Sequence, residues 1–170
     1  MKMRQSNQDV VEVGKVVKNF SAMGSSGELF ELSAFKGKKI ILYFYPKDDT
    51  PRCTLEGQQF NHFLKEFSEL NAHVFGVSRD SATSHCKFID KYGFKFELLS
   101  DQDEKLCQIF DVIKEKNMYG KKVLGIERST FIINEEGVLV KEYRKVKADG
   151  HAEEILNDLS WWDYNLVWAD

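Results

Sequence analysis

One cysteine, Cys53, follows a short polar loop in the stretch Thr50-Pro51-Arg52-Cys53. Threonine is a preferred N-cap residue and proline is favoured at the first helical position, so this stretch predicts a helix that begins at Pro51. Cys53 then lies in the first turn, where unpaired N–H groups and the positive end of the helix dipole favour a thiolate over a thiol. The chemistry predicted by this position is nucleophilic attack by sulfur.

The same cysteine also fits the core of the protein. Cys53 precedes Phe60 by seven residues and therefore shares the inward stripe of the predicted helix. Free cysteine is among the most frequently buried residue types, so a purely structural thiol is an alternative to a reactive one. The stripe consists of Phe60, Phe63, Leu64 and Phe67.

The segments around this helix alternate between strand and helix patterns. Residues 39–45 form a continuous β-branched and aromatic run, typical of a strand buried on both faces. Turn-forming residues at 23–27 predict a hairpin within residues 11–36. Strands that alternate with helices and end in a hairpin indicate an α/β domain with a mixed sheet. The further expected strands are 72–78, 96–99, 129–134 and 138–146, and the further expected helices are 82–92, 104–112 and 152–159.

Length and composition favour one globular domain. The chain has 170 residues, of which 42% are hydrophobic, and a formal net charge of -3. The negative charge gives no attraction to nucleic acid or to anionic lipid, so we expect neither partner. Residues 1–19 lack the apolar stretch of a signal peptide, and the longest apolar run, residues 40–45, is too short to cross a bilayer. We therefore expect a soluble protein.

The cysteine count points to a reducing compartment. Cys53, Cys86 and Cys107 are too few and too scattered for a disulfide scaffold, and their odd number leaves a free thiol unless chains cross-link. We therefore expect the cytoplasm.

The domain is expected to span residues 1–160, with an aromatic tail at 161–170 that holds all three tryptophans. We expect the tail to lie beyond the final helix and to pack back onto the domain, although a partner-binding patch is an alternative.

Several other site classes are not indicated. The histidines show no zinc-like spacing with the cysteines, and P-loop and dinucleotide fingerprints are absent, so we expect no metal and no bound cofactor. A thioredoxin-type oxidoreductase needs a CxxC pair, but Thr50 occupies the first of those positions. The histidines are His62, His73, His85 and His151.

The run from Tyr43 to Glu56 resembles the active-site segment of peroxiredoxins of the bacterioferritin comigratory protein (PrxQ-like) branch. Its core, Pro-x-x-x-Thr-x-x-Cys, is present as Pro46, Thr50 and Cys53. The resemblance is colinear over residues 10–160, so it covers a whole domain. Further similar segments are 76–81, 84–85, 91–93, 98–101, 128–134 and 146–151.

The resemblance implies a thioredoxin-like fold with peroxiredoxin elaborations: an N-terminal hairpin and a central mixed sheet flanked by helices. It implies that Cys53 is the peroxidatic cysteine, that Thr50 hydrogen-bonds the thiolate and peroxide, that Pro46 shields the pocket, and that Arg128 holds the thiolate and polarises the peroxide. The implied function is antioxidant reduction of hydrogen peroxide and small alkyl hydroperoxides by a monomer recycled by thioredoxin or another thiol. Without the resemblance, Thr50 is a plain helix cap and Arg128 a surface cation.

Two residues depart from the pattern of that branch. Many members carry a resolving cysteine five residues after the peroxidatic one, where this chain has Gln58. Arg52 replaces the usual glycine, and we expect its side chain to point to solvent. The sulfenic acid of Cys53 could then be resolved by an external thiol, by Cys86 on the helix at 82–92, or by Cys107, which its apolar neighbours mark as a structural thiol. A non-enzymatic redox sensor or binding module, in which Cys53 oxidises slowly and changes a surface, is the remaining alternative.

Overall fold

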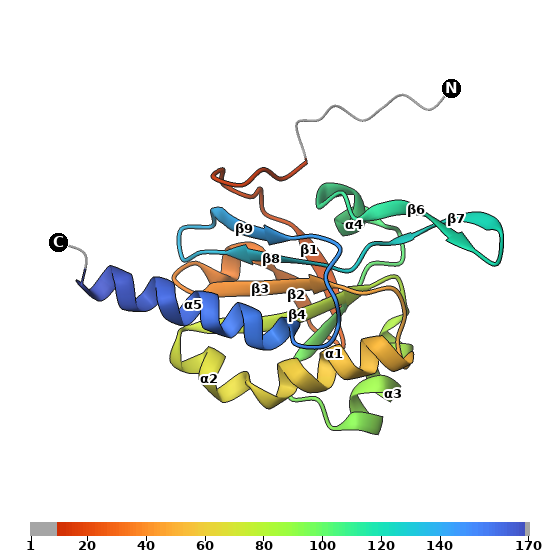
Figure 1. Ribbon diagram of the computed structural model, residues 1–170, viewed down its shortest axis with the longest axis horizontal. Helices are drawn as coiled ribbons and strands as arrows, with labels where there is room; N and C mark the ends of the chain where they lie inside the picture. Colours follow the sequence, from red (N-terminus) through yellow and green to blue (C-terminus); the bar gives the residue numbers. More distant parts are fainter. Residues whose placement is uncertain (1–9, 169–170) are drawn as a thin grey trace.

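A computed structural model describes residues 10–168 (Figure 1). Expectations for residues 1–9 and 169–170 fall outside this range. No helix within it is long and apolar enough to span a membrane. The strands are β1 (Ser21–Gly24), β2 (Leu29–Glu31), β3 (Lys39–Phe44), β4 (Ala72–Ser78), β5 (Glu97–Ser100), β6 (Ile113–Met118), β7 (Lys121–Ile126), β8 (Ser129–Ile133) and β9 (Leu139–Tyr143). The helices are α1 (Pro51–His62), α2 (Leu64–Glu69), α3 (Ala82–Tyr92), α4 (Lys105–Ile109) and α5 (His151–Trp168).

The central sheet is mixed and has the strand order β2-β1-β5-β4-β3-β8-β9. Strand β3 pairs in parallel with β4 and antiparallel with β8, and β4 continues in parallel to β5. Strands β1 and β2 form the expected hairpin. Strand β1 also pairs with β5, and this pairing attaches the hairpin to the rest of the sheet. The expected α/β fold with a mixed sheet and an N-terminal hairpin is therefore confirmed.

Helices α1, α2, α3 and α5 cover one face of the sheet, and helix α4 covers the opposite face (Figure 1). Side chains of β3 alternate between the two faces: Leu42 and Phe44 join the cluster with α4, whereas Tyr43 joins the cluster with α1, α2, α3 and α5. Both clusters contain fully buried side chains, so β3 is buried on both sides, as its apolar run predicts.

The helix expected from Pro51 is broken at Phe63. The backbone there has φ -102° and ψ 11°, and the Phe63 N–H donates to the Phe60 carbonyl, three residues earlier. Helices α1 and α2 thus replace one continuous helix. Phe60 and Phe67 on the predicted stripe are fully buried, whereas Phe63 and Leu64 beside the break are only half-buried.

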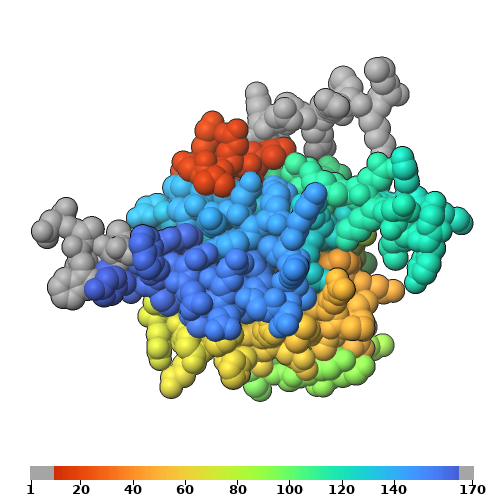
Figure 2. Space-filling view, in the orientation of Figure 1, coloured from red at the N-terminus to blue at the C-terminus, as the bar shows by residue number. Residues whose placement is uncertain are grey.

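Two further elements differ from the expectations. Strands β6 and β7 form a separate antiparallel hairpin that projects from the body of the molecule (Figure 2) and that the sequence did not predict. Helix α5 continues to Trp168, so the first part of the expected tail is helical and does not lie beyond the final helix. Trp162 on this extension packs against the core, whereas Trp161 is 65% exposed.

Candidate active site

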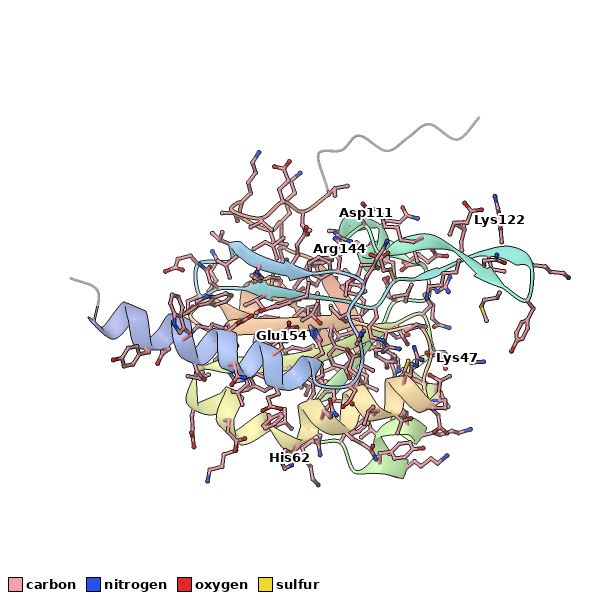
Figure 3. All side chains as sticks on the ribbon, viewed as in Figure 1. Lys47, His62, Asp111, Lys122, Arg144 and Glu154 are labelled. Carbon is pink, nitrogen blue, oxygen red and sulfur yellow. The ribbon has the colours of Figure 1, made fainter. Side chains whose placement is uncertain are left out.

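Cys53 lies in the first turn of α1, as its local sequence predicts. Thr50 is the N-cap residue with an extended backbone, and Pro51 is the first helical residue. The Thr50 hydroxyl does not cap the helix: it donates to the carbonyl of Lys47 at 2.9 Å. Lys47 is exposed on the loop before α1 (Figure 3). The Cys53 side chain is only 3% exposed, so the thiol is both at a helix start and buried.

Arg128 reaches Cys53 from the neighbouring strand. Ser129 pairs with Phe44 in the antiparallel β3–β8 ladder, which places Arg128 beside the end of β3 and the loop that leads to α1. Its Nη2 atom lies 3.4 Å from the Cys53 Sγ atom. A guanidinium that donates to sulfur stabilises the thiolate form. The structure therefore brings together two predicted site residues that are 75 positions apart.

Glu56 is a site residue that the sequence analysis missed. Its Oε1 atom accepts a hydrogen bond from Arg128 Nη1 at 2.7 Å, and its side chain is fully buried. Burial raises the pKa of Glu56 from 4.5 to about 7, although Arg128 opposes this rise. Burial lowers the pKa of Arg128, but Glu56 and Cys53 together raise it above its ordinary value. Glu56 thus anchors one side of the guanidinium while the other side faces sulfur.

The spacing of Glu56 is a signal that the sequence does contain. Cys53, Glu56 and Phe60 follow the 0, 3, 7 spacing of one helical face, and a carboxyl group on an inward stripe needs a buried cation nearby. Glu56 Oε2 and the nearby Tyr43 hydroxyl are buried and have no hydrogen-bond partner among the described residues.

A cavity of about 500 Å³ opens beside Arg128. Pro46 forms part of its wall and is half-buried, and Arg52 and Leu55 from α1 lie at its rim. Arg52 is exposed, as expected. Lys116 reaches the cavity from the projecting hairpin, and burial and Arg128 lower the pKa of Lys116. The cavity is therefore lined by both cationic and apolar groups. The remaining lining residues are Arg128, Val146, Lys147, Ala148 and Asp149.

The other two cysteines lie elsewhere in the fold. Cys86 is exposed on α3, and its Sγ donates to the Ser25 carbonyl at 3.2 Å. Cys107 is fully buried in the cluster on the opposite face of the sheet from Cys53. Burial and Asp101 raise the pKa of Cys107 strongly, which makes it a poor nucleophile. Gln58 is exposed on α1. The described residues contain no cluster of potential metal ligands.

Comparison with known proteins decides the family. Residues 13–142 match the sequence model of the AhpC/TSA family. The chain is a peroxiredoxin. It is 57% identical over 132 residues to Peroxiredoxin Bcp of Xanthomonas campestris pv. campestris, a match that covers 78% of this chain and 82% of that protein. Peroxiredoxin Bcp of Bacillus subtilis is 48% identical over 149 residues, which cover 88% of this chain and 95% of the relative.

Solved peroxiredoxin structures share the fold. A mutant of PrxQ from Xylella fastidiosa superposes with a TM-score of 0.86 at 46% identity, covering 90% of this chain and 98% of that one. The bacterioferritin comigratory protein of Xanthomonas campestris, described in connection with alkyl peroxide reduction, gives a TM-score of 0.79 at 53% identity over 83% and 90% of the two chains. The thioredoxin-like fold of peroxiredoxins is thereby confirmed, and this peroxiredoxin is a thiol peroxidase.

Proposed function

We propose that Cys53 is the peroxidatic cysteine and that it reduces hydrogen peroxide and small alkyl hydroperoxides. The observation that carries this proposal is the contact between Arg128 Nη2 and Cys53 Sγ in the first turn of α1. The thiolate attacks one peroxide oxygen, the O–O bond breaks, and Cys53 becomes a sulfenic acid. The departing oxygen takes up a proton and leaves as water or as an alcohol.

Arg128 is proposed to stabilise this transition state. Negative charge moves from sulfur to the departing oxygen during the reaction. Arg128 is already held between Glu56 and Cys53, so its guanidinium can stabilise the negative charge on both atoms without first changing position. Thr50 is proposed to orient the peroxide as an acceptor, since its own proton is donated to Lys47 and its oxygen lone pairs remain free for a peroxide O–H. Pro46, in the cavity wall, is proposed to exclude water.

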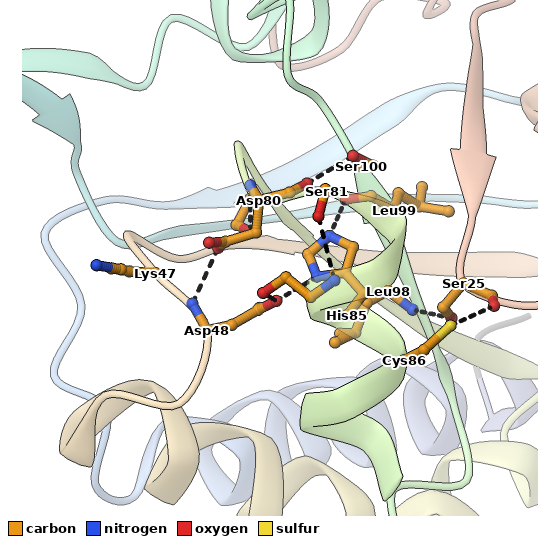
Figure 4. Close-up of polar contacts among 12 residues, drawn as sticks. Ser25, Lys47, Asp48, Asp80, Ser81, His85, Cys86, Leu98, Leu99 and Ser100 are labelled. Carbon is orange, nitrogen blue, oxygen red and sulfur yellow. Dashed lines mark hydrogen bonds and ion pairs between the residues drawn. The ribbon is translucent and has the colours of Figure 1, made fainter.

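An external thiol is proposed to resolve the sulfenic acid. Gln58 cannot form a disulfide, Cys107 lies across the sheet, and Cys86 points toward Ser25, away from the loop that holds Asp48 (Figure 4). The external thiol condenses with the Cys53 sulfenic acid to give a mixed disulfide and water, and a second thiol then releases reduced Cys53. Thioredoxin is the proposed source of both thiols.

We also propose that the protein works as a monomer in the cytoplasm in antioxidant defence. Cys53, Cys86 and Cys107 are all free thiols, which suits a reducing compartment.

The test is the intact mass of the fully reduced protein after one equivalent of hydrogen peroxide, followed by peptide mapping. We expect one added oxygen on Cys53, and we expect Cys53→Ser to lose peroxide turnover. Cys86→Ser is the matched control and should gain the same oxygen. A Cys53–Cys86 disulfide would show that Cys86, and not an external thiol, resolves the sulfenic acid. An unmodified Cys53, or a Cys53→Ser variant that still turns over peroxide, would refute the proposed nucleophile.

A further inference from the structure

A buried polar network lies directly behind the loop that precedes α1 (Figure 4). At its centre are His85, which is fully buried in the first turns of α3, and Asp48 of the loop, which is 7% exposed. His85 Nδ1 lies 2.8 Å from Asp48 Oδ2, and His85 Nε2 lies 3.0 Å from the Leu99 carbonyl oxygen on β5.

The donors and acceptors around His85 favour one arrangement of protons in the network. The Leu99 carbonyl can only accept, so Nε2 must carry a proton. The Asp48 carboxyl accepts from the Tyr45 hydroxyl at 2.6 Å and from the Ser84 hydroxyl at 2.8 Å. Two such donors favour an ionised carboxylate at Asp48. Nδ1 and Nε2 of His85 then both face oxygen acceptors, and the Tyr45 hydroxyl lies 3.5 Å from Nδ1.

The same loop is also held through its backbone. The Asp48 N–H donates to Asp80 Oδ2 at 2.9 Å, and Ser78 donates to the same oxygen at 2.6 Å. Asp80 thus places a second carboxylate next to the Asp48 backbone. Pro46 and Thr50, the two loop residues proposed to act at Cys53, lie two positions on either side of Asp48. The contacts of Asp48 therefore tie down the middle of the short loop that carries both residues.

We propose that His85 is a positioning residue for peroxide reduction: as a buried imidazolium it fixes Asp48 and thereby holds Pro46 in the cavity wall and Thr50 at the start of the helix that carries Cys53. This inference rests on the proposed role of Cys53. Buried charges are strongly destabilising when one partner is removed, so the pair is a rigid attachment and not an incidental contact. Its loss should impair the orientation of peroxide more than the reactivity of the thiolate itself.

The first test needs no peroxide, and it uses a variant of His85 only to assign the signals. Nitrogen-15 NMR of the reduced, full-length protein near neutral pH should show a directly bonded proton on both ring nitrogens of His85, assigned by the loss of these signals in His85→Gln. An unprotonated Nδ1 or Nε2 in the folded protein would overturn the inference. This result is independent of whether Cys53 reacts with peroxide, so it separates failure of the pair from failure of the proposed function.

The second test compares Asp48→Asn with Asp49→Asn. Asp49 is the next residue of the loop but is exposed and contacts Lys91 and Tyr92 near the end of α3. For each variant we would measure the rate of Cys53 oxidation by hydrogen peroxide and the rate of Cys53 alkylation by iodoacetamide, at a temperature where circular dichroism shows a folded protein.

We expect the ratio of oxidation to alkylation rates to fall by about tenfold or more in Asp48→Asn and to stay within about twofold of wild type in Asp49→Asn. An Asp48→Asn protein that is less stable but keeps the wild-type ratio would show a purely structural pair and would overturn the inference. An equal fall in both variants would also overturn it.

Discussion

Arg128 and Cys53 are 75 positions apart in the chain, and yet the Arg128 Nη2 atom lies 3.4 Å from the Cys53 sulfur. The contact exists because β8 pairs with β3, whose end leads into the loop before α1. The other arm of the guanidinium is held by Glu56 from α1 itself. The proposed peroxidatic site is thus assembled by the sheet and the helix together.

No other cationic side chain should support Cys53 oxidation as well as Arg128 does. Lysine keeps the charge but cannot reach Glu56 and Cys53 at once, because it lacks the planar fork of the guanidinium. We expect Arg128→Lys and Arg128→Met to slow Cys53 oxidation by peroxide about 10- to 100-fold, which corresponds to about 1.5–3 kcal/mol for a hydrogen bond to a charged group. Stopped-flow kinetics would measure this, and a wild-type rate in Arg128→Lys would contradict it.

Glu56 should make stability depend on pH. Its pKa is about 7 in the folded protein and near 4.5 in the unfolded chain, so the folded state binds more protons between these values. The stability that protonated Glu56 contributes is therefore fully present below about pH 4.5 and is lost as pH rises through about 7, a change of about 3 kcal/mol. Glu56→Gln should abolish this decline while still accepting a hydrogen bond from Arg128.

Urea unfolding from about pH 5 to about pH 8 would measure the effect, since the free energy of unfolding follows from the midpoint and slope. Glu69→Gln is the matched control, because Glu69 is an exposed glutamate on α2. Parallel pH profiles for wild type and Glu56→Gln would contradict the raised pKa.

The tryptophans of α5 should differ in their contribution to stability. Trp162 packs against the core, whereas Trp161 is 65% exposed. We expect Trp162→Ala to lower the free energy of unfolding by about 1–3 kcal/mol and Trp161→Ala to change it by at most about 0.5 kcal/mol. Thermal or urea unfolding of the two variants provides the comparison. Equal effects would mean that the extension of α5 does not rest on the domain through Trp162.

Cys86 should be dispensable for turnover. If an external thiol resolves Cys53, Cys86→Ser should keep thioredoxin-supported peroxide reduction within about twofold of wild type. A coupled assay that follows consumption of the reductant would measure this. Loss of turnover with normal first oxidation of Cys53 would instead identify Cys86 as the resolving thiol and would require α3 to rearrange, since Cys86 faces Ser25.

Helices and strands could be predicted from the sequence where an apolar pattern is bounded by residues that start or end the element. Helix α3 spans the expected residues because Ser81 caps its first turn and Gly93 ends it in the left-handed conformation. Hairpin β6–β7 could not be predicted in the same way, because its strands pair only with each other and most of their side chains are exposed. An apolar periodicity arises only where an element packs on a core.

The residues of the candidate site also divide into some that the sequence predicts and some that it does not. Cys53 could be located because its environment is local, set by Thr50 and Pro51 in the preceding residues. Glu56 could not be assigned from the sequence, because its partner Arg128 lies 72 positions away and only the β3–β8 register brings the two together. Long-range pairs of this kind depend on topology that a single sequence does not contain.

Because Cys107 is buried on the far side of the sheet, its oxidation indicates something different from the oxidation of Cys53. Its thiol is covered on the face opposite the cavity, and its raised pKa keeps it protonated in the folded protein. If Cys53 is the peroxidatic residue, its oxidation reports an encounter with peroxide. A sulfur atom that oxidants meet only after the sheet has opened reports a history of unfolding. Over-oxidised Cys107 in molecules recovered from stressed cells would therefore mark the fraction of the population that had lost its fold.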